Sequence, residues 1–491
     1  MISMNGSIST LTFNDLWSLL PELVLATGGV VILLLDALVP AWKRLWAPLA
    51  LATTGLAAWG AWAAWNAVAR EPGLSWNGLL ETSQITYAFS LVILIAAALS
   101  VLASEGYLRR ERILGGEYFA LLLWCATGLL LMLRATELLT IFLALELLSV
   151  CLYALAGYHR RLALSVEAAI KYFLMGAFVS AFALYGIALV YGATGSTRLA
   201  AVGAALAAGN GSILLSLGIL LLVAAFGFKM SIAPFHAWSP DTYQGAPSPF
   251  VAFLSVAPKV ASALVLYRLL AAVAEGGYGA KWSGAIAGLA VLSMVVGNLL
   301  ALVQQDIKRM LAYSGVAHMG YLLLALVELD RASLAPVLVY LTAYALMNAG
   351  AFTVVSMLYS RPGEQHLRSE LAGWGYRFPL LGACLAISML SLGGIPPTVG
   401  FLGKYMVFLN VIEDGHWGLA LVGVAASLVG VFYYLRIVYL LYMKPETRAP
   451  QGLLIDLWGR TAAVVAAAAT LVLGLWPSAW IEWLLRATAS R

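Results

Sequence analysis

The stretch AFGFKMSIAPFHAWSPDTY, residues 225–243, places a lysine and a histidine, Lys229 and His236, within a long apolar segment. Gly227 and Pro234 flank the lysine, so a helix running through this stretch is expected to be interrupted there. A charged side chain at membrane depth is costly unless it has a partner, water or an altered charge state. The stretch therefore predicts a broken membrane helix around a functional lysine.

The composition of the whole chain indicates a protein that crosses a lipid bilayer many times. Of its 491 residues, 62% are hydrophobic and only 10% are charged. Apolar runs of about 18 residues or more recur along the chain and are apolar all round rather than amphipathic. We predict an all-α polytopic membrane protein with about fourteen transmembrane helices. Their centres are expected near residues 27, 57, 95, 125, 146, 178, 223, 261, 293, 318, 346, 395, 427 and 473.

The charges outside the apolar runs predict the orientation of the chain. Roughly 15 Lys and Arg residues lie in one alternate set of loops and about six in the other, which by the positive-inside rule makes the first set cytoplasmic and places both termini on the outer, periplasmic side. The basic set is Lys43, Arg44, Arg109, Arg110, Arg112, Arg160, Arg161, Lys308, Arg309, Arg361, Arg368, Arg377, Lys444, Arg448 and Arg460. The net charge of +5 is typical of such loops, and no nucleic-acid partner is expected.

An internal echo predicts two repeats of five helices. YFLMGAF at residues 172–178 resembles YALMNAGAF at residues 344–352, and the same offset of about 172 residues carries Glu146 onto His318 and Lys229 to within about three residues of Lys404. Five spans is an odd number, so the repeats are expected to be inverted. The predicted regions are 1–114 with three helices, 115–275 with spans 4–8, 276–445 with spans 9–13, and 446–491 with helix 14.

A second run, SLGGIPPTVGFLGK at residues 391–404, predicts another broken helix in span 12. Discontinuous helices at matching positions of two repeats are the usual pointer to an ion path. The three cysteines, Cys125, Cys151 and Cys384, lie in apolar runs without a CxxC motif, so neither an iron–sulfur centre nor a disulfide is expected.

Four buried charges are the main candidates for function. Glu146 lies near the centre of span 5, Lys229 in span 7 and Lys259 in the centre of span 8, just after Pro258. Lys404 follows the break of span 12. Each has a structural alternative, since the acid can hydrogen-bond to Ser149 or a neighbouring helix, and the lysines can pack between helices or extend to the membrane surface.

Three further candidates rest on weaker signals. His318 lies in the middle of span 10, where a histidine either carries a proton or is a hydrogen-bonded core residue. His236 lies where span 7 meets its loop. Lys171 is only about seven residues into span 6, so extension of its side chain to the membrane surface is the competing structural interpretation. Glu22, Asp36, Glu137 and Arg436 are at least as consistent with interface or structural roles.

These residue types predict a proton relay. A Glu and a Lys a few ångströms apart in low dielectric stabilise each other's charged forms, so moving a neighbouring charge moves a proton. Glu146 and Lys229 would form a switchable pair, Lys259 the central relay and Lys404 the exit.

At these residues the chain resembles the antiporter-like membrane subunits of respiratory complex I and of Mrp-type sodium/proton antiporters. The resemblance covers essentially the whole chain. It is carried by LELLSVCLYAL, residues 145–155, FKMSIAPFHAWSPDTYQGAPSP, residues 228–249, APKVASA, residues 257–263, DIKRMLAYSGVAHMGY, residues 306–321, and GGIPPTVGFLGK, residues 393–404. Within the family, the lysine at position 404, the LLPELVLATGGVVILLLD start and the short end after span 14 resemble the N, or subunit 2, type.

The resemblance implies that Glu146, Lys229, Lys259 and Lys404 are proton-pathway residues and that His318 connects them. It also implies a translocase whose NADH, FMN, iron–sulfur clusters and quinone are bound by partner subunits, with no cofactor or metal in this chain. The implied partners are an M-type subunit and small K-, J- and A-type subunits, in a bacterial plasma membrane.

Three other functions compete with this interpretation. An Mrp-type cation/proton antiporter would use the same Glu and Lys residues without a redox partner. A haem b protein needs paired mid-membrane histidines, whereas only His318 lies in the middle of a span. A structural membrane protein would not explain several buried ionisable groups whose cost a leucine avoids.

Overall fold

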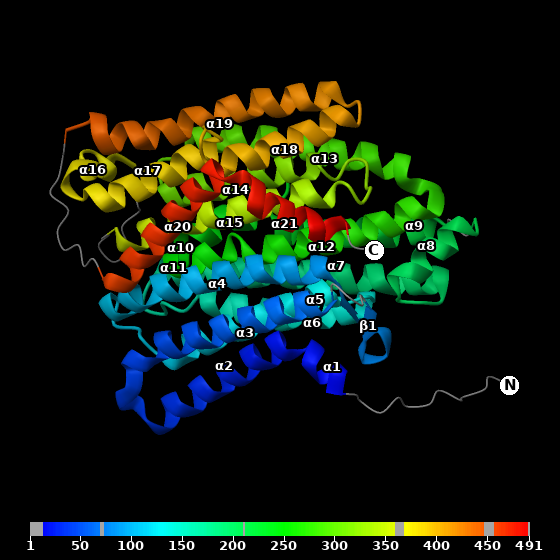
Figure 1. The fold of residues 1–491 in the computed structure, drawn as a ribbon, viewed down its shortest axis with the longest axis horizontal. Coiled ribbons are helices and arrows are strands. Elements are labelled where there is room, and N and C mark those ends of the chain that lie inside the picture. The colour runs from blue at the N-terminus through cyan, green and yellow to red at the C-terminus, as the bar shows by residue number, and fades with distance from the viewer. Residues whose placement is uncertain (1–12, 69–72, 210–211, 359–367, 446–455, 490–491) are drawn as a thin grey trace.

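The computed structural model describes residues 13–68, 73–209, 212–358, 368–445 and 456–489. The molecule is a bundle of long helices running in roughly one direction and its reverse (Figure 1). Its helices are α1 (Phe13–Ser18), α2 (Leu20–Leu38), α3 (Trp46–Val68), α4 (Gln84–Arg110), α5 (Gly116–Arg134), α6 (Leu138–Ala156), α7 (Ala163–Thr194), α8 (Leu199–Ala207), α9 (Ile213–Met230), α10 (Trp238–Gly245), α11 (Ser248–Leu254), α12 (Ala257–Val273), α13 (Gly279–Val303), α14 (Ile307–Leu324), α15 (Leu334–Met357), α16 (Trp374–Arg377), α17 (Pro379–Gly393), α18 (Val399–Glu413), α19 (Trp417–Met443), α20 (Leu457–Leu475) and α21 (Pro477–Ala489).

Short elements complete the described chain. They are the 3₁₀ turns η1 (Pro40–Leu45), η2 (Trp76–Gly78) and η4 (Arg368–Leu371), the π turn η3 (Ala274–Tyr278), and the antiparallel hairpin β1 (Gly73–Ser75) and β2 (Leu80–Thr82). Arg361 and Arg448, two of the loop charges in the orientation argument, lie outside the described residues.

The helices confirm a polytopic all-α membrane fold. Among the described residues, ten helical segments are long and apolar enough to cross a membrane. Thirteen of the fourteen predicted centres fall inside a helix, and the remaining one, at 395, falls between α17 and α18. That last position is the predicted break of span 12.

Two spans are interrupted where the sequence predicts it. The first half-helix α9 ends at Met230, and its C-cap Ser231 takes a left-handed conformation with φ 60°. The half-helix α17 ends in the same way at Gly394, with φ 77°, which glycine adopts without steric cost. The structure also contains a third interruption, between α11 and α12, with Pro258 in the first turn of α12. In the sequence, this position is marked only by Pro258, just before Lys259.

Helix α15 lies deep inside the bundle, because 94% of the residues in its most apolar stretch are buried. It packs against α4, α11, α17, α18 and α20. Because residues four apart share one helix face, Tyr340, Tyr344 and Asn348 project from α15 on one side. The fold thus places a polar stripe of α15 at the centre of an otherwise apolar core.

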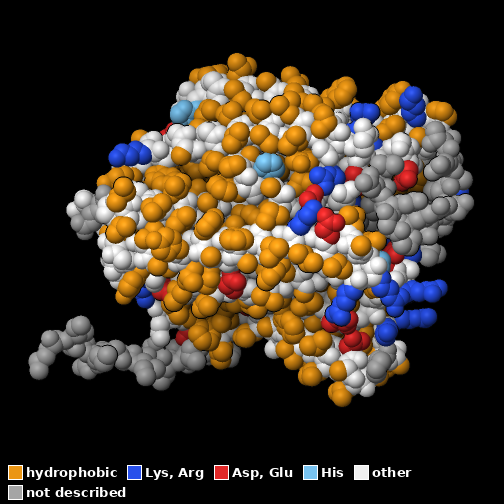
Figure 2. Space-filling model, turned by 180° about the vertical axis from the view of Figure 1, so that it is seen from behind, with side chains coloured by type: hydrophobic (Ala, Val, Ile, Leu, Met, Phe, Trp, Pro, Cys, Tyr) orange, Lys and Arg blue, Asp and Glu red, His pale blue; other side chains and the backbone are white. Residues whose placement is uncertain are grey.

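The two ends of the bundle differ in charge. Helix α16 lies at one end, whereas α8, the hairpin and the start of α1 lie at the other (Figure 1). Seen from behind, Lys and Arg side chains gather toward one end of the molecule, and a broad hydrophobic surface covers its middle (Figure 2). This is the surface expected of a protein that spans a bilayer.

Candidate functional site

Lys229 lies in the last turn of α9 and is buried. Its Nζ donates a hydrogen bond of 2.8 Å to Ser149 Oγ on α6. The faces of Tyr153 and Tyr172 lie 5.5 and 5.7 Å from the ammonium, within cation–π range. The carbonyls at the end of α9 carry partial negative charge, so the interrupted helix stabilises a cation at its own end.

Glu146 is one turn before Ser149 on α6 and is half-buried. Its Oε1 accepts a hydrogen bond of 2.5 Å from Ser180 Oγ on α7. Among the described residues, Glu146 and Lys229 form no direct ion pair, and Ser149 lies between them in the sequence of contacts. The reason is positional, because Ser149 occupies the place beside the ammonium and Glu146 turns toward α7.

Lys259 lies in the first turn of α12, directly after the third interruption, and is buried. Its Nζ donates to the Tyr344 hydroxyl at 3.2 Å, and the Tyr344 ring centroid is 5.2 Å away. Room for this ammonium comes from Gly315 of α14, where an added Cβ would lie 2.7 Å from Lys259 Nζ. Unlike Lys229, Lys259 is at the positive N-terminal end of its helix and gains nothing from the helix dipole.

His318 is buried on α14 between tyrosine hydroxyls from two other helices. Its Nδ1 is 2.6 Å from Tyr340 OH on α15, and its Nε2 is 3.0 Å from Tyr434 OH on α19. The Tyr344 ring lies 5.2 Å from the imidazole, between centroids. In a neutral imidazole one ring nitrogen donates and the other accepts, so His318 joins hydroxyls on its two sides.

Lys404 of α18 turns back to the end of α17. Its Nζ donates to Leu392 O and Gly393 O, each at 3.1 Å, and to Ser427 Oγ of α19 at 2.9 Å. The aliphatic part of the lysine passes over Gly394, where an added Cβ would lie 2.8 Å from Lys404 Cδ. Lys404 is therefore held at a helix C-terminus, as Lys229 is.

The two weaker candidates lie apart from this buried line. Lys171 has a side chain that is 41% exposed and pairs with Glu167 and with Asp241 at 2.8 Å. Asp241 also accepts from Arg309 at 2.5 Å, so the lysine belongs to a network of charges that includes the start of α14. His236 is half-buried in the turn between α9 and α10, with its ring 6.2 Å from that of Tyr313.

Sequence reasoning missed the tyrosines that separate the charged groups. The spacing of Tyr340, Tyr344 and Asn348 was a signal for them, because polar residues at intervals of four mark one face of an otherwise apolar helix. No sequence pattern indicated the hydrogen bond between Tyr434 and His318, because α19 contacts His318 only in the folded chain.

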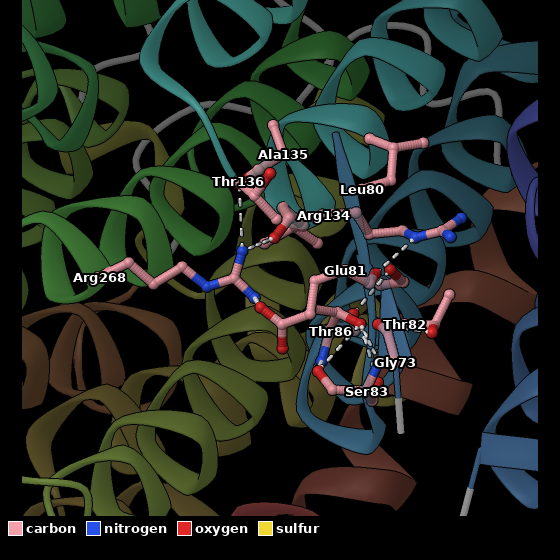
Figure 3. A network of polar contacts seen from close by, with 12 residues as sticks. Gly73, Leu80, Glu81, Thr82, Ser83, Thr86, Arg134, Ala135, Thr136 and Arg268 are labelled. Atoms are coloured by element: carbon pink, nitrogen blue, oxygen red, sulfur yellow. Dashed lines mark hydrogen bonds and ion pairs between the residues drawn. The ribbon is translucent and has the colours of Figure 1, made fainter. Parts of the chain in front are cut away.

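A buried arginine was also missed, and it is seen in Figure 3. Arg134, fully buried at the end of α5, pairs with Glu22 at 2.9 Å and donates through Nη1 to Ser18 O at 2.6 Å and through Nε to Glu81 O at 3.2 Å. The Glu81 side chain pairs in turn with Arg268 of α12 at 2.7 Å. The network fastens the hairpin and α2 to the end of the bundle, which gives Glu22 a structural role.

Comparison with known proteins identifies the family. Residues 135–430 match the family model described as "NADH:quinone oxidoreductase/Mrp antiporter, TM". NADH-quinone oxidoreductase subunit N of Trichlorobacter lovleyi is 37% identical, over 95% of this chain and 95% of that protein. The chain belongs to the subunit N family of NADH-quinone oxidoreductase. Subunit N of Salinibacter ruber is 40% identical, over 85% of this chain and 84% of that protein.

Solved structures agree with this assignment. A chain of respiratory complex I from Thermus thermophilus superimposes with a TM-score of 0.79 at 35% identity, covering 94% of this chain and 99% of that one. A chain of the Mrp complex from Dietzia sp. DQ12-45-1b has a TM-score of 0.84 at 20% identity, covering 98% and 97%. The second likeness shows a shared fold alone.

Proposed function

We propose that this protein carries protons across a bacterial plasma membrane as a membrane-arm subunit of NADH:quinone oxidoreductase. The relatives named subunit N support the assignment to that complex. NADH, FMN, the iron–sulfur clusters and quinone are expected in partner subunits, whose electron transfer drives the proton movement. The Mrp-type antiporter is the weaker alternative, because the likeness to the Mrp chain is one of fold at 20% identity.

The observation that carries the proposal is the unbroken series of contacts in the second half of the chain. Lys259 contacts Tyr344, whose ring packs against His318. His318 then contacts Tyr434 through a ring nitrogen. The Tyr321 ring also packs against His318, at 5.9 Å between centroids, and the Lys404 ammonium lies 5.1 Å from the centroid of that ring. Amines, an imidazole and phenols can each release and accept a proton, so rotation within this series can pass a proton between the two lysines.

In the first half, Glu146 receives the proton and passes it to Lys229. Ser149 is the connecting group, since it is one turn from Glu146 and contacts Lys229 Nζ. Ser180 steadies the carboxylate from the neighbouring helix.

Buried hydroxyls mark the link between the two halves. Ser231 Oγ and Tyr243 OH are both buried and lie close to each other, and neither has a further hydrogen-bond partner among the described residues. The Tyr243 ring centroid is 6.0 Å from Lys259 Nζ, and Ser231 follows Lys229 by two residues. Buried polar atoms of this kind are usually satisfied by ordered water. We infer that a short chain of water joins Lys229 to Lys259 here.

Charge repulsion couples the protonation of the three lysines. Within the described residues, Lys229, Lys259 and Lys404 form no ion pair. Two ammonium groups in a low-dielectric interior repel each other, so a proton that arrives at one amine favours release from the next. An event in a partner subunit that protonates Glu146 would therefore propagate toward Lys404.

The finer topology belongs to the same proposal. Fourteen crossings, with spans 4–8 and 9–13 as inverted repeats, are supported by the matching interruptions at Ser231 and Gly394. The end of the bundle that bears the basic loops is expected to face the cytoplasm, so both termini would be periplasmic. The expected neighbours are an M-type subunit and the small K-, J- and A-type subunits.

Substitution in the assembled complex tests the path. Lys229→Ala should abolish most NADH-driven proton pumping in proteoliposomes, and Glu146→Ala should do the same, with Glu146→Asp milder. Assembly is verified first by native electrophoresis, because an unpaired buried charge itself costs about 3–5 kcal/mol. Lys281→Ala, an exposed lysine at the start of α13, is the matched control. Unchanged pumping in a fully assembled Lys229→Ala complex would reject the path.

A further inference from the structure

The backbone at the third interruption lacks the hydrogen bonds that hold a continuous helix. Pro258 has no N–H to donate to Leu254 O, one turn back. Lys259 N donates to Val256 O, only three residues back, at 3.0 Å. Val256 itself has φ −117°, far from the helical value. Side chains from other helices must therefore fix the angle at which α12, and with it Lys259, leaves α11.

Asn348 of α15 supplies such a side chain. Its Nδ2 donates a hydrogen bond of 2.7 Å to Ser255 Oγ, at the end of α11. Ser255 Oγ donates in turn to Ala252 O at 3.2 Å, so α15 is joined through the serine to the last turn of α11. The start of α11 is held separately, because Ser100 Oγ of α4 donates to Pro249 O at 2.7 Å. Asn348 thus holds the end of α11 that adjoins the interruption.

Two contacts of α15 with this part of the chain match in spacing. Tyr344 and Asn348 are four residues apart and lie on one face of α15. Their partners, Lys259 and Ser255, are also four residues apart, one on each side of the interruption. The two pairs fix the register of α15 against the interruption, so a change at the asparagine alters the geometry at the tyrosine.

The amide of Asn348 is unfavourable for packing alone. The side chain is fully buried, and its Oδ1 has no hydrogen-bond partner in the described part of the chain. An unpaired buried acceptor destabilises the folded state, and a leucine of similar size avoids that penalty. The asparagine is therefore explained by the hydrogen bond that its Nδ2 makes to Ser255.

We propose that Asn348 is a positioning residue for the proton relay. Through Ser255 it holds the interruption at the angle that places Lys259 Nζ beside the Tyr344 hydroxyl. The inference rests on the proposed proton path, because it concerns the geometry of the central lysine of that path. When the asparagine bond is lost, the interruption can turn, and Lys259 Nζ spends less time at the hydroxyl. Transfer of a proton from Lys259 then fails in more cycles, and fewer protons are pumped per NADH.

Asn348→Leu in the fully assembled complex tests the proposal. The change keeps the side-chain volume similar and leaves Lys259, Tyr344 and Ser255 in place. Protons pumped per NADH in proteoliposomes should fall about twofold to tenfold, the range expected for the loss of one hydrogen bond. The pH profile of pumping should change in the same way as that of Tyr344→Phe, because both variants disturb one contact.

Asn410→Leu is the matched control, because it removes another buried amide with an unpaired Oδ1, on α18 rather than at the interruption. Its pumping and pH profile should be those of the unchanged complex. The exchange of Asn348→Ser with Ser255→Asn places the same two groups on opposite sides of the contact. This exchanged pair should recover the pumping that Asn348→Ser alone loses.

The Tyr344→Phe background separates positioning from general packing. If Asn348 acts through the contact of Lys259 with Tyr344, adding Asn348→Leu to Tyr344→Phe should cause no further loss of pumping. Additive losses, or a loss with an unchanged pH profile, would show a structural role alone and overturn the proposal. Normal pumping by Asn348→Leu beside an impaired Tyr344→Phe would overturn it and leave the proton path standing. Normal pumping by Tyr344→Phe would remove that step of the path and this inference with it.

Discussion

Gly315→Ala is expected to interrupt the relay without removing any titratable group. The added Cβ would lie 2.7 Å from Lys259 Nζ and 3.0 Å from Tyr344 OH, closer than ordinary van der Waals contact. The flexible end of the lysine is the part that can yield, so its 3.2 Å hydrogen bond to the hydroxyl is lost. A hydrogen bond to a charged group contributes about 1.5–3 kcal/mol, so the connected arrangement should become about tenfold to a hundredfold less populated.

Folding should survive this change. Gly315 lies inside α14, where alanine is intrinsically favoured over glycine by about 1 kcal/mol. The assay is NADH-driven acidification of proteoliposomes that contain the assembled complex, with NADH oxidation measured in parallel. We expect a large loss of protons pumped per NADH. Gly288→Ala on α13 is the control, because no atom lies within 4 Å of its added Cβ.

A double-variant cycle decides whether the alanine acts through this contact. Tyr344→Phe removes the same hydrogen bond from the other side. If both changes break one link, the combined variant should pump no worse than the more affected single variant. Normal pumping by Gly315→Ala, or strictly additive losses in the cycle, would refute the reasoning.

Two further predictions concern other buried contacts. Ser149→Ala leaves the Lys229 ammonium without its hydrogen-bond acceptor, and a loss of about 1–3 kcal/mol in stability is expected with reduced pumping, measured by thermal unfolding and proteoliposome acidification. Glu22→Gln leaves Arg134 buried without its counter-charge, so the unfolding free energy should fall by about 3–5 kcal/mol while pumping per assembled complex stays normal. The apolar double variant Glu22→Leu with Arg134→Met should recover much of that stability in the same melt.

Controls separate these effects from general damage. Ser216→Ala on α9 removes an exposed hydroxyl whose bond is to its own helix backbone, and it should change neither property. A Ser149→Ala complex that pumps normally would show that the serine does not connect Glu146 to Lys229. A stable Glu22→Gln variant would show that Arg134 is satisfied by its carbonyl partners alone.

The sequence predicts the class of fold and the depth of the charged residues because both depend on local composition. An apolar run long enough to span a bilayer predicts a transmembrane helix from its composition alone. Gly and Pro residues beside Lys229 and before Lys404 indicate that the helix is interrupted there. The third interruption, before Lys259, gave a weaker signal. Pro258 is compatible with the first turn of a new helix or with a bend in a continuous one, and only packing decides between them.

Contacts between helices could not be predicted in the same way. The sequence places Glu146 and Lys229 at similar depth, but side-chain direction depends on how α6 rotates against α7 and α9. In the folded chain, Lys229 donates a hydrogen bond to Ser149, and Ser180 donates one to Glu146. The hydroxyls around His318 come from α15 and α19, which are distant in sequence, so their convergence is a property of tertiary packing alone.

Both interrupted helices place a lysine ammonium at the C-terminal end of a half-helix, but the lysines come from opposite sides of the break. Lys229 belongs to the half-helix before its break, whereas Lys404 belongs to the half-helix after its break and reaches back to Leu392 O and Gly393 O. In both cases the ammonium lies at a C-terminal helix end, where unpaired carbonyls stabilise positive charge. Lys259, at a helix N-terminus, lacks that stabilisation. The helix-end carbonyls therefore stabilise the ammonium of the two outer lysines, whereas the Lys259 ammonium is held by the Tyr344 hydroxyl and the neighbouring tyrosine rings.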